Sequence, residues 1–439
     1  MSIEVILAIA SFFTLITLIM ITGMPVAFAL GFVGIVLGSL VGTWNGMLGH
    51  LGQLSYAKLS SYHLSVLPLF FLMGHLAFES GIADDLYSLG YKWVGKLPGG
   101  LMSATIVACG MFGGISGTSS GDAATIGRIA IHEMEKYHYN SSIAAGTVAV
   151  GGLLGPLIPP SAIMVIVGIA AETSIGKLLV AVLLPGLLIM VVLIIAATFI
   201  GIIRPDLCPR ARVKFTWRER FVSLKATWAA IAIFIAVIGG IFIGLFTPTE
   251  GASIGVFLAF LLLVYRKRGR DFWQPLKRAV FETLWTNAMI FTIILGSVVF
   301  NSALLLSGFT TWLVDAIAAL NLSPTATIVG LLSIYIPLGM FLEIVAMVLI
   351  TIPVFVPVAI SLGFDPIWFC VIAGVVINLG PVSPPVGLNL FVVKGVAPHI
   401  SLIDIVRGTL PYLGFHFISI AILISFPQIT LLLPRLMQG

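Results

Sequence analysis

The chain has 439 residues, of which 59% are hydrophobic and only 9% carry a charge. A soluble globular domain usually contains about 25% charged residues, so this composition excludes an ordinary soluble protein and predicts a polytopic membrane protein. The net charge of +5 does not indicate a nucleic-acid partner. The three cysteines have neither the spacing of a metal site nor that of a disulfide framework.

The first apolar run, Val5–Ile21, is expected to be a retained membrane span. It lacks the basic start and the small-residue cleavage site of a signal peptide. Further spans are predicted near Val26–Val41 and Leu64–Phe78, followed by a charged helix around Asp84–Lys96.

Glycine and hydroxyl residues then interrupt the apolar sequence between Gly113 and Asp122. We expect a re-entrant helical hairpin over about residues 98–138, with its tip at this break. A second break follows at Leu154–Pro160, where two consecutive prolines cannot continue a helix. It predicts a broken helix over about residues 141–172. Within a bilayer, such breaks persist only where the freed backbone groups are buried in protein or line a polar cavity.

Basic residues are concentrated in Arg204–Lys225 and Arg266–Arg278, a pattern that is typical of cytoplasmic loops. The apolar stretch between these loops must therefore cross the membrane twice, with a turn near Thr247–Glu250. A span near Trp285–Leu306 and a helix around Thr310–Leu320 are expected to follow.

The second half of the chain repeats the landmarks of the first half in the same order and at a nearly constant separation. It contains a predicted hairpin over about residues 324–361 and a predicted broken helix over about residues 366–397. The matched landmarks are Pro25 with Pro248, Ser80-Gly81 with Ser307-Gly308, Pro98 with Pro324, Gly113 with Gly339, Gly155-Pro156 with Gly380-Pro381, and Pro185 with Pro411. The alternative is an ordinary helical bundle with coincidental breaks, but six landmarks in order favour an internal repeat.

These landmarks predict a first repeat over residues 1–204, a basic cytoplasmic linker over 205–225, and a second repeat over 226–439. Each repeat would contain about five spans and one hairpin. Because five is odd, the second repeat must be inverted. We therefore expect the first hairpin to open to the cytoplasm, the second to open to the outside, and both termini to lie outside.

The tip of the first hairpin combines hydroxyl side chains, an acidic residue and glycines. Hydroxyl and carbonyl oxygens are the ligands that a hard cation prefers. We therefore predict a sodium site built from the side chains of Ser116, Ser119 and Ser120 and backbone oxygens near Gly152 and Gly155. The alternative is a close-packed crossing of small residues, which explains the glycines but not the hydroxyls.

A pseudo-symmetric second sodium site is predicted at Gly339, Glu343, Asn378, Gly380 and Ser383. Glu343 is a functional candidate because acidic residues within membrane segments usually serve a function. Capping of the following helix by Glu343 is an equally good explanation.

An anionic substrate is expected between the two ion sites, near the broken helices. Half-helix N-termini present free amides and a positive dipole end to an anion. The predicted substrate-binding residues are Thr118, Asp122, Pro160, Ser161, Pro385 and Asn389. Arg128 is interpreted as a side chain that extends to the cytoplasm rather than one that holds substrate. Glu250 is expected to cap a helix, and the histidines at 75 and 416 to serve packing.

The sequence is also compatible with two other classes of function. Gly114-Ile115-Ser116-Gly117 matches the pattern around the nucleophile of intramembrane serine proteases, for which His416 is a conceivable base. A protease, however, leaves the second half unexplained. Broken helices would also suit an ion channel, but the inverted repeat favours a carrier with alternating access. A flux that saturates with substrate would distinguish a carrier from a channel.

Several segments together resemble the large membrane subunit of tripartite ATP-independent periplasmic (TRAP) transporters. They are Thr22-Gly23-Met24-Pro25, Gly113–Ser120, Gly155–Ser161, Thr173–Leu178, Phe246–Glu250 and Ser383–Phe391. The resemblance covers essentially the whole chain. It departs from the family pattern at Ser120-Gly121-Asp122, at Arg128, and at Gly380–Ser383, where Gly-x-x-Thr is more usual.

The resemblance implies an all-α elevator-type carrier of the ion transporter superfamily, not an enzyme, in a bacterial or archaeal cytoplasmic membrane. It implies a sodium gradient as the driving force, with neither ATP nor a cofactor. It also implies two partners, a periplasmic substrate-binding protein and a small four-helix membrane subunit. The small subunit is expected to be a separate chain, because the first span follows Met1 directly. Members of the family carry C4-dicarboxylates, sialic acid, other sugar acids, keto acids or sulfonates.

Overall fold

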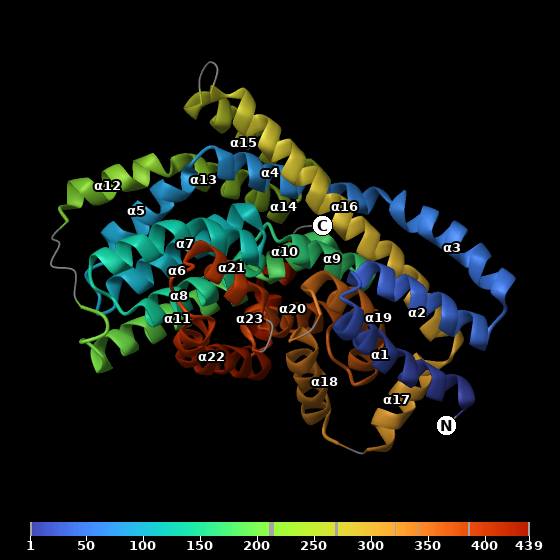
Figure 1. Ribbon diagram of the computed structural model, residues 1–439. Coiled ribbons are helices and arrows are strands. Elements are labelled where there is room, and N and C mark those ends of the chain that lie inside the picture. The colour runs from blue at the N-terminus through green and yellow to red at the C-terminus, as the bar shows by residue number, and fades with distance from the viewer. Residues whose placement is uncertain are drawn as a thin grey trace. The chain divides into compact units, whose positions relative to one another are not determined.

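A computed structural model describes residues 2–209, 215–267, 271–320, 322–340, 342–384 and 387–437. These residues are nearly all helical and contain no strand (Figure 1). Among them, six helices are long and apolar enough to cross a membrane, or up to nine if each bent pair of helices counts as one span. The predicted all-α polytopic fold is therefore confirmed.

The helices form two compact units, and each unit takes segments from both halves of the chain. The first unit comprises Met1–Ser65, Ile166–Thr173 and Leu284–Gly380, and the second comprises Val66–Val165, Ser174–Thr283 and Pro381–Gly439. The inverted repeats concern the order of elements along the chain, whereas the two units are groups of helices in space. The division into units therefore does not test the repeats. They remain a prediction.

The first unit contains the N-terminal helices and the hairpin of the second half. Its elements are α1 (Ile3–Thr22), α2 (Val26–Val41), α3 (Trp44–Leu59), η1 (Tyr62–Ser65), most of α16 (Trp273–Leu306), α17 (Phe309–Ala319), α18 (Pro324–Gly339), α19 (Ile344–Ser361) and α20 (Pro366–Ile377). Helix α19 is the most enclosed of the long apolar helices in this unit.

The second unit contains the hairpin of the first half and the C-terminal helices. Its elements before the basic loop are α4 (Val66–Glu79), α5 (Ile82–Val94), α6 (Gly100–Ser116), α7 (Ser119–Lys136), α8 (Ser141–Gly151), η2 (Gly152–Leu157), the start of α9 (Ala162–Ala170), α10 (Ile175–Ala181) and α11 (Leu183–Ile203). Those after it are α12 (Trp217–Ala226), α13 (Trp228–Phe234), the π-helical segment η3 (Ile235–Gly239), α14 (Gly240–Phe242), α15 (Pro248–Arg266), α21 (Leu388–Val396), α22 (Leu402–Ser425) and α23 (Gln428–Leu436). The short η5 (Gly380–Val382) lies at the boundary between the units.

Helix ends follow the capping chemistry of the sequence. Ser2 caps the start of α1, and its hydroxyl accepts a hydrogen bond from the amide of Val5. Thr247 and Glu250 form a reciprocal capping box at the start of α15, so the expected capping role of Glu250 is confirmed. Gly117 caps the C-terminal end of α6, and its φ of 64° is a left-handed backbone conformation that favours glycine.

Two helices differ from the sequence-based expectation. Helix α3 was not predicted, because its three glycines and several polar side chains hide the apolar pattern of a span. The helix expected from Trp285 begins instead at Trp273, because the polar residues Lys277, Arg278 and Glu282 continue the same helix. In both cases, polar residues within the helix obscure the apolar pattern of a span.

Helical breaks occur where the sequence places Gly and Pro. Helix α8 and η2 together form an angle of 51° with α9, across the Pro159-Pro160 pair. This pair contains a cis peptide bond. In the other half, α20 ends at Ile377 and is capped by Asn378, just before η5 and α21.

Candidate functional site

The tip of the first hairpin packs directly on the first broken helix, inside the second unit. A methyl group added to Gly113 would lie 2.5 Å from the Cα atom of Gly155. Since such a contact is far too short for any real Cβ atom, only glycine allows the two backbones to approach so closely. The two breaks predicted from the sequence therefore meet at one place.

Asp122 is the central polar side chain of this contact and is fully buried. The hydroxyl of Ser116 donates a hydrogen bond to its Oδ1 atom. Its Oδ2 atom accepts no hydrogen bond from any residue that the structure describes. A buried carboxylate without compensation is costly, so Asp122 has the chemistry of a group that awaits a cation.

Backbone oxygens lie close to the free oxygen of Asp122. A methyl group added to Gly155 would lie 2.5 Å from Asp122 Oδ2 and 2.7 Å from the carbonyl oxygen of Thr118. A carboxylate oxygen and a carbonyl oxygen therefore face the same glycine. This set of oxygen donors suits a small hard cation such as sodium.

Ser119 is held against the first broken helix by a residue from the far end of the chain. The side-chain amide of Asn389 donates hydrogen bonds to Ser119 Oγ at 2.7 Å and to the carbonyl of Ala149 at 3.1 Å. A methyl group added to Gly152 would lie 2.7 Å from the carbonyl oxygen of Ser119. The sequence predicted Asn389 as a substrate ligand, but its side-chain nitrogen donates hydrogen bonds to other groups of the protein. Ser120 lies beside this group and is half-buried.

In the first unit, the second hairpin approaches the second broken helix in the same way. A methyl group added to Gly339 would lie 2.7 Å from the Cα atom of Gly380 and 3.5 Å from Cε of Met347. The thioether side chain of Met347 therefore lies beside this glycine pair, whereas the pair Gly113 and Gly155 has the carboxylate of Asp122.

The other residues of the second predicted sodium site lie on neighbouring segments. Oε2 of Glu343 accepts hydrogen bonds from the amides of Val345 at 2.8 Å and Ala346 at 3.3 Å, so this side chain caps α19. Asn378 is buried at the end of α20 in the first unit, and Ser383 is buried in the second unit.

Two of the remaining predicted substrate ligands also have structural roles. The hydroxyl of Ser161 donates to the carbonyl of Pro156 and accepts from the amide of Met164 in the first turn of α9. The carbonyl of Pro160 lies beside Gly117 at the hairpin tip. Pro385 lies outside the described residues.

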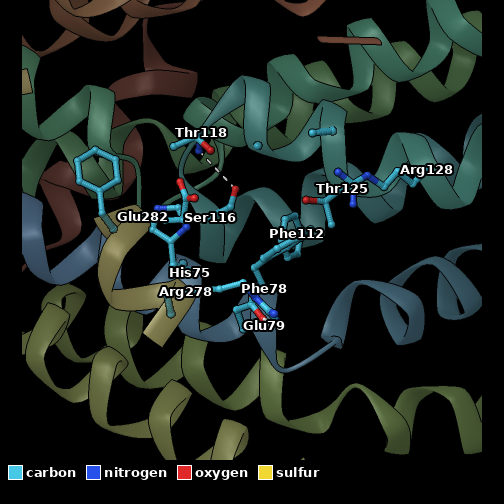
Figure 2. A pocket seen from close by; sticks show the side chains of 15 residues that line it. His75, Phe78, Glu79, Phe112, Ser116, Thr118, Thr125, Arg128, Arg278 and Glu282 are labelled. Carbon is cyan, nitrogen blue, oxygen red and sulfur yellow. Dashed lines mark hydrogen bonds and ion pairs between the residues drawn. The ribbon is translucent and has the colours of Figure 1, made fainter. Parts of the chain in front are cut away.

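A pocket of about 600 Å³ opens beside the hairpin tip, within the second unit (Figure 2). Ser116 and Thr118 line it, together with Gly121, Thr125 and Arg128. The last three follow one face of α7. Arg128 is exposed and forms no ion pair with any residue in the described part of the chain. Its guanidinium group therefore borders the pocket as an available cation.

Charged and ionisable residues from α4 and α16 also line this pocket. Arg278 donates two hydrogen bonds to Glu79, at 3.0 and 2.7 Å, and His75 and Glu282 lie near this pair (Figure 2). Sequence reasoning missed these four residues as pocket residues. The available signal was their spacing, since His75 with Glu79 and Arg278 with Glu282 are four apart and so share a helix face.

The site contains no cluster typical of a transition metal. Within the described ranges, no group of three His, Cys, Asp or Glu residues is arranged to hold a metal ion. The oxygen donors described above are suited to a different kind of cation, one that binds hydroxyls, carbonyls and a single carboxylate.

Residues 13–429 match the family described as "Tripartite ATP-independent periplasmic transporter, DctM component". The chain is 34% identical to the sialic acid TRAP transporter large permease protein SiaM of Vibrio cholerae, over 96% of this chain and 97% of that protein. It is 32% identical to the C4-dicarboxylate TRAP transporter large permease protein DctM of the same organism, over 99% of each chain.

The helical arrangement also resembles a solved structure. The YdaH transporter of Alcanivorax borkumensis aligns with a TM-score of 0.61, over 89% of each chain and with 15% sequence identity. At this identity, the likeness shows a shared fold and nothing finer.

Proposed function

The chain belongs to the DctM family of large permeases in tripartite ATP-independent periplasmic transporters, and we propose that it imports a small organic anion together with sodium. It is a multi-pass protein of the inner membrane. Because the family consists of permeases and not enzymes, the Gly-x-Ser-Gly segment at the hairpin tip does not mark a protease.

Two observations support an anionic substrate. The relatives named above transport sialic acid and C4-dicarboxylates, which all carry carboxylate groups. In this chain, Arg128 borders a pocket of about 600 Å³ together with the polar residues Ser116, Thr118 and Thr125. A guanidinium group beside hydroxyls has the chemistry to hold a carboxylate. This proposal replaces the earlier interpretation of Arg128 as a side chain that only extends to the cytoplasm.

The buried carboxylate of Asp122 is the observation on which sodium coupling mainly rests. Its Oδ2 atom has no hydrogen-bond donor among the described residues, and it faces Gly155 together with the Thr118 carbonyl. We assign a first sodium ion to this place, with Ser116, Ser119, Ser120 and the backbone near Gly152 completing the site. Asp122 thus moves from the predicted substrate ligands to the proposed ion ligands.

We assign a second sodium ion to the matching glycine contact in the other hairpin. Its proposed ligands in the first unit are Gly339, Glu343, Asn378 and Gly380, and the sequence also predicts Ser383, three residues after Gly380. Both recorded hydrogen bonds to Glu343 involve Oε2, so capping and ion binding use different oxygens in this proposal. The two hairpins would move as an elevator. A periplasmic binding protein would deliver the substrate, and a small membrane subunit would be the second partner. A channel is the alternative, and saturable uptake would exclude it.

Uptake into proteoliposomes that contain the chain, its binding protein and its small subunit tests the proposal. The labelled probes are sialic acid and a C4-dicarboxylate, chosen after a thermal-shift screen of the binding protein against organic acids. Ser119→Ala and Ser383→Ala should each weaken sodium activation by roughly 5- to 150-fold, which corresponds to about 1–3 kcal/mol for an unmet buried polar group. Linkage requires substrate affinity to fall at fixed sodium and to recover at high sodium.

The outcomes separate two claims. Uptake that does not depend on sodium in the wild-type protein would refute coupling itself. Uptake that depends on sodium, but equally in the wild type and in both variants, would refute only the assignment of these hydroxyls.

A further inference from the structure

Helix α12 presents an exposed aromatic and aliphatic stripe. Trp217, Phe221, Leu224 and, just after the helix, Trp228 recur with the spacing of one helical face. Their exposed fractions are 66%, 59%, 37% and 62%. Two tryptophans on one outward face are unusual for a helix end that only faces water, because tryptophan favours the boundary between lipid and water.

The face of α12 that lies about a quarter turn from the stripe is already occupied. Ser223 and Thr227 are buried on it, and α12 lies against α5 (Figure 1). At the edge of this contact, the ring of Phe221 meets Trp93 of α5 at 6.4 Å in an edge-on arrangement. The helix therefore cannot rotate to bury its stripe without exposing residues that now pack on α5.

Two cations follow one edge of the stripe. Arg218 and Lys225 are seven residues apart and therefore lie on the same side of the helix. Neither forms an ion pair or a hydrogen bond with a residue in the described ranges. The nearest acid in sequence, Glu219, is engaged in a capping box, where it accepts a hydrogen bond of 2.7 Å from the amide of Thr216.

Arg220 lies at the other edge of the stripe and behaves differently. Its guanidinium group is 5.0 Å from the ring centre of Trp217, which is a cation–π contact. Arg220 thus fixes the orientation of the tryptophan, whereas Arg218 and Lys225 are available to an external anion.

We propose that the outer face of α12 binds the headgroups of anionic phospholipids in the cytoplasmic leaflet. In this site the aromatic stripe enters the boundary between headgroups and acyl chains, and Arg218 and Lys225 contact lipid phosphates. We place α12 on the cytoplasmic side because seven basic residues lie within Arg204–Lys225.

The geometry of the segment agrees with this placement. Helix α12 is bent by 53° from the rod formed by α13, η3 and α14. When that rod crosses the membrane, α12 can lie along the membrane surface. A protein partner would have to supply both an apolar groove and acidic groups, whereas an anionic membrane presents both features together.

Comparison with α11 shows why the charge matters. This helix also has exposed apolar residues at a spacing of four, Val191, Ile195 and Phe199, but no Lys or Arg accompanies them within Leu183–Ile203. Such a face contacts acyl chains without preference for a headgroup. The cations beside the α12 stripe therefore predict selectivity, and not only contact with lipid.

The test uses the full chain in nanodiscs that contain phosphatidylcholine and phosphatidylglycerol. One of the two lipids is brominated at a time, and quenching of tryptophan fluorescence is measured. The signal from α12 is the part that disappears in the Trp217→Phe/Trp228→Phe variant. We expect brominated phosphatidylglycerol to quench this signal more strongly than brominated phosphatidylcholine at equal mole fraction. Each of the two cations should enrich phosphatidylglycerol around α12 by about fivefold.

The Arg218→Gln/Lys225→Gln variant should lose this preference and retain equal quenching by both lipids. A matched control, Lys136→Gln/Arg407→Gln, removes two exposed cations that already lie near acidic residues and should keep the preference. For the wild-type protein, about 1 M salt should have the same effect as the loss of the two cations, because screening then extends over about 3 Å. This arm does not depend on the folding of the Arg218→Gln/Lys225→Gln variant.

Three results would overturn the proposal. They are equal quenching by both lipids in the wild type, a preference that survives both high salt and the double variant, and protection of α12 from all lipid quenchers. Protection that appears only when the small subunit is added would assign the face to a protein interface instead.

Discussion

The side-chain amide of Asn389 donates a 2.7 Å hydrogen bond to the hydroxyl of Ser119, although the two residues lie 270 positions apart in the chain. The same amide reaches the carbonyl of Ala149 in α8 at 3.1 Å. One side chain from the second broken helix therefore holds the first hairpin tip against the first broken helix. In the proposed mechanism, this bond links the repeats at the first sodium site.

Asn389→Ala should weaken sodium activation in the same direction as Ser119→Ala, because Asn389 positions the Ser119 hydroxyl. If the hydrogen bond is the common cause, the double variant should be no worse than the more impaired single variant. The measurement is the sodium dependence of uptake for the complete set of variants. Thr105→Ala, which removes a buried hydroxyl bonded within α6, is the control and should leave sodium activation unchanged. Strict additivity of the two changes would contradict a shared role.

The glycine contacts make a prediction about stability that does not depend on the substrate. Gly339→Ala would place a methyl group 2.7 Å from the Cα atom of Gly380, so we expect a destabilisation of about 1–3 kcal/mol from overpacking. Gly330 is the matched control, because it lies on the same helix and a methyl group there meets no atom within 4 Å. Gly330→Ala should leave the protein as stable or slightly more stable. Thermal unfolding in detergent, followed by light scattering or fluorescence, compares the two, and equal midpoints would refute the close contact.

The local features of this fold could be predicted because they depend on the chain's own backbone chemistry. Pro-Pro and Gly-Pro segments predicted the broken helices, and the Gly-rich run at 113–122 predicted a hairpin tip, because these residues determine where a helix can continue. The Thr247–Glu250 segment likewise predicted its own capping box. Each of these inferences needed only residues that are close in sequence.

The contacts around the site could not be predicted in the same way, since they join distant segments. The pair of Glu79 with Arg278 and the bond of Asn389 to Ser119 leave no pattern in a single sequence. Helix α3 was missed for another reason. Its mixed composition matches neither an apolar span nor a typical loop, and its packing had to be seen in the structure.

The predicted topology can be tested with single cysteines at exposed positions. Glu172 follows the first broken helix and should lie outside, whereas Asp271 lies in the second basic loop and should face the cytoplasm. The three native cysteines are buried, so they should give little background. An impermeant maleimide added to intact cells should label Glu172→Cys, and it should label Asp271→Cys only after the membrane is permeabilised. Labelling of Asp271→Cys in intact cells would rule out the predicted orientation.

The acids of the two hairpins, Asp122 and Glu343, should respond differently to loss of charge. Oδ2 of Asp122 accepts no hydrogen bond within the described residues, whereas Oε2 of Glu343 accepts two from backbone amides. Asp122→Asn should therefore weaken sodium activation strongly, by roughly 5- to 150-fold, because the ion is the main compensation for this carboxylate. Glu343→Gln should have the smaller effect on sodium activation, and its main cost should be a lower thermal stability of about 0.5–2 kcal/mol from a weaker cap. Uptake against sodium concentration, measured with thermal unfolding for both variants, gives the comparison. If Glu343→Gln impairs sodium activation as much as Asp122→Asn while its unfolding temperature is unchanged, then Glu343 is primarily an ion ligand and the capping role assigned here is secondary.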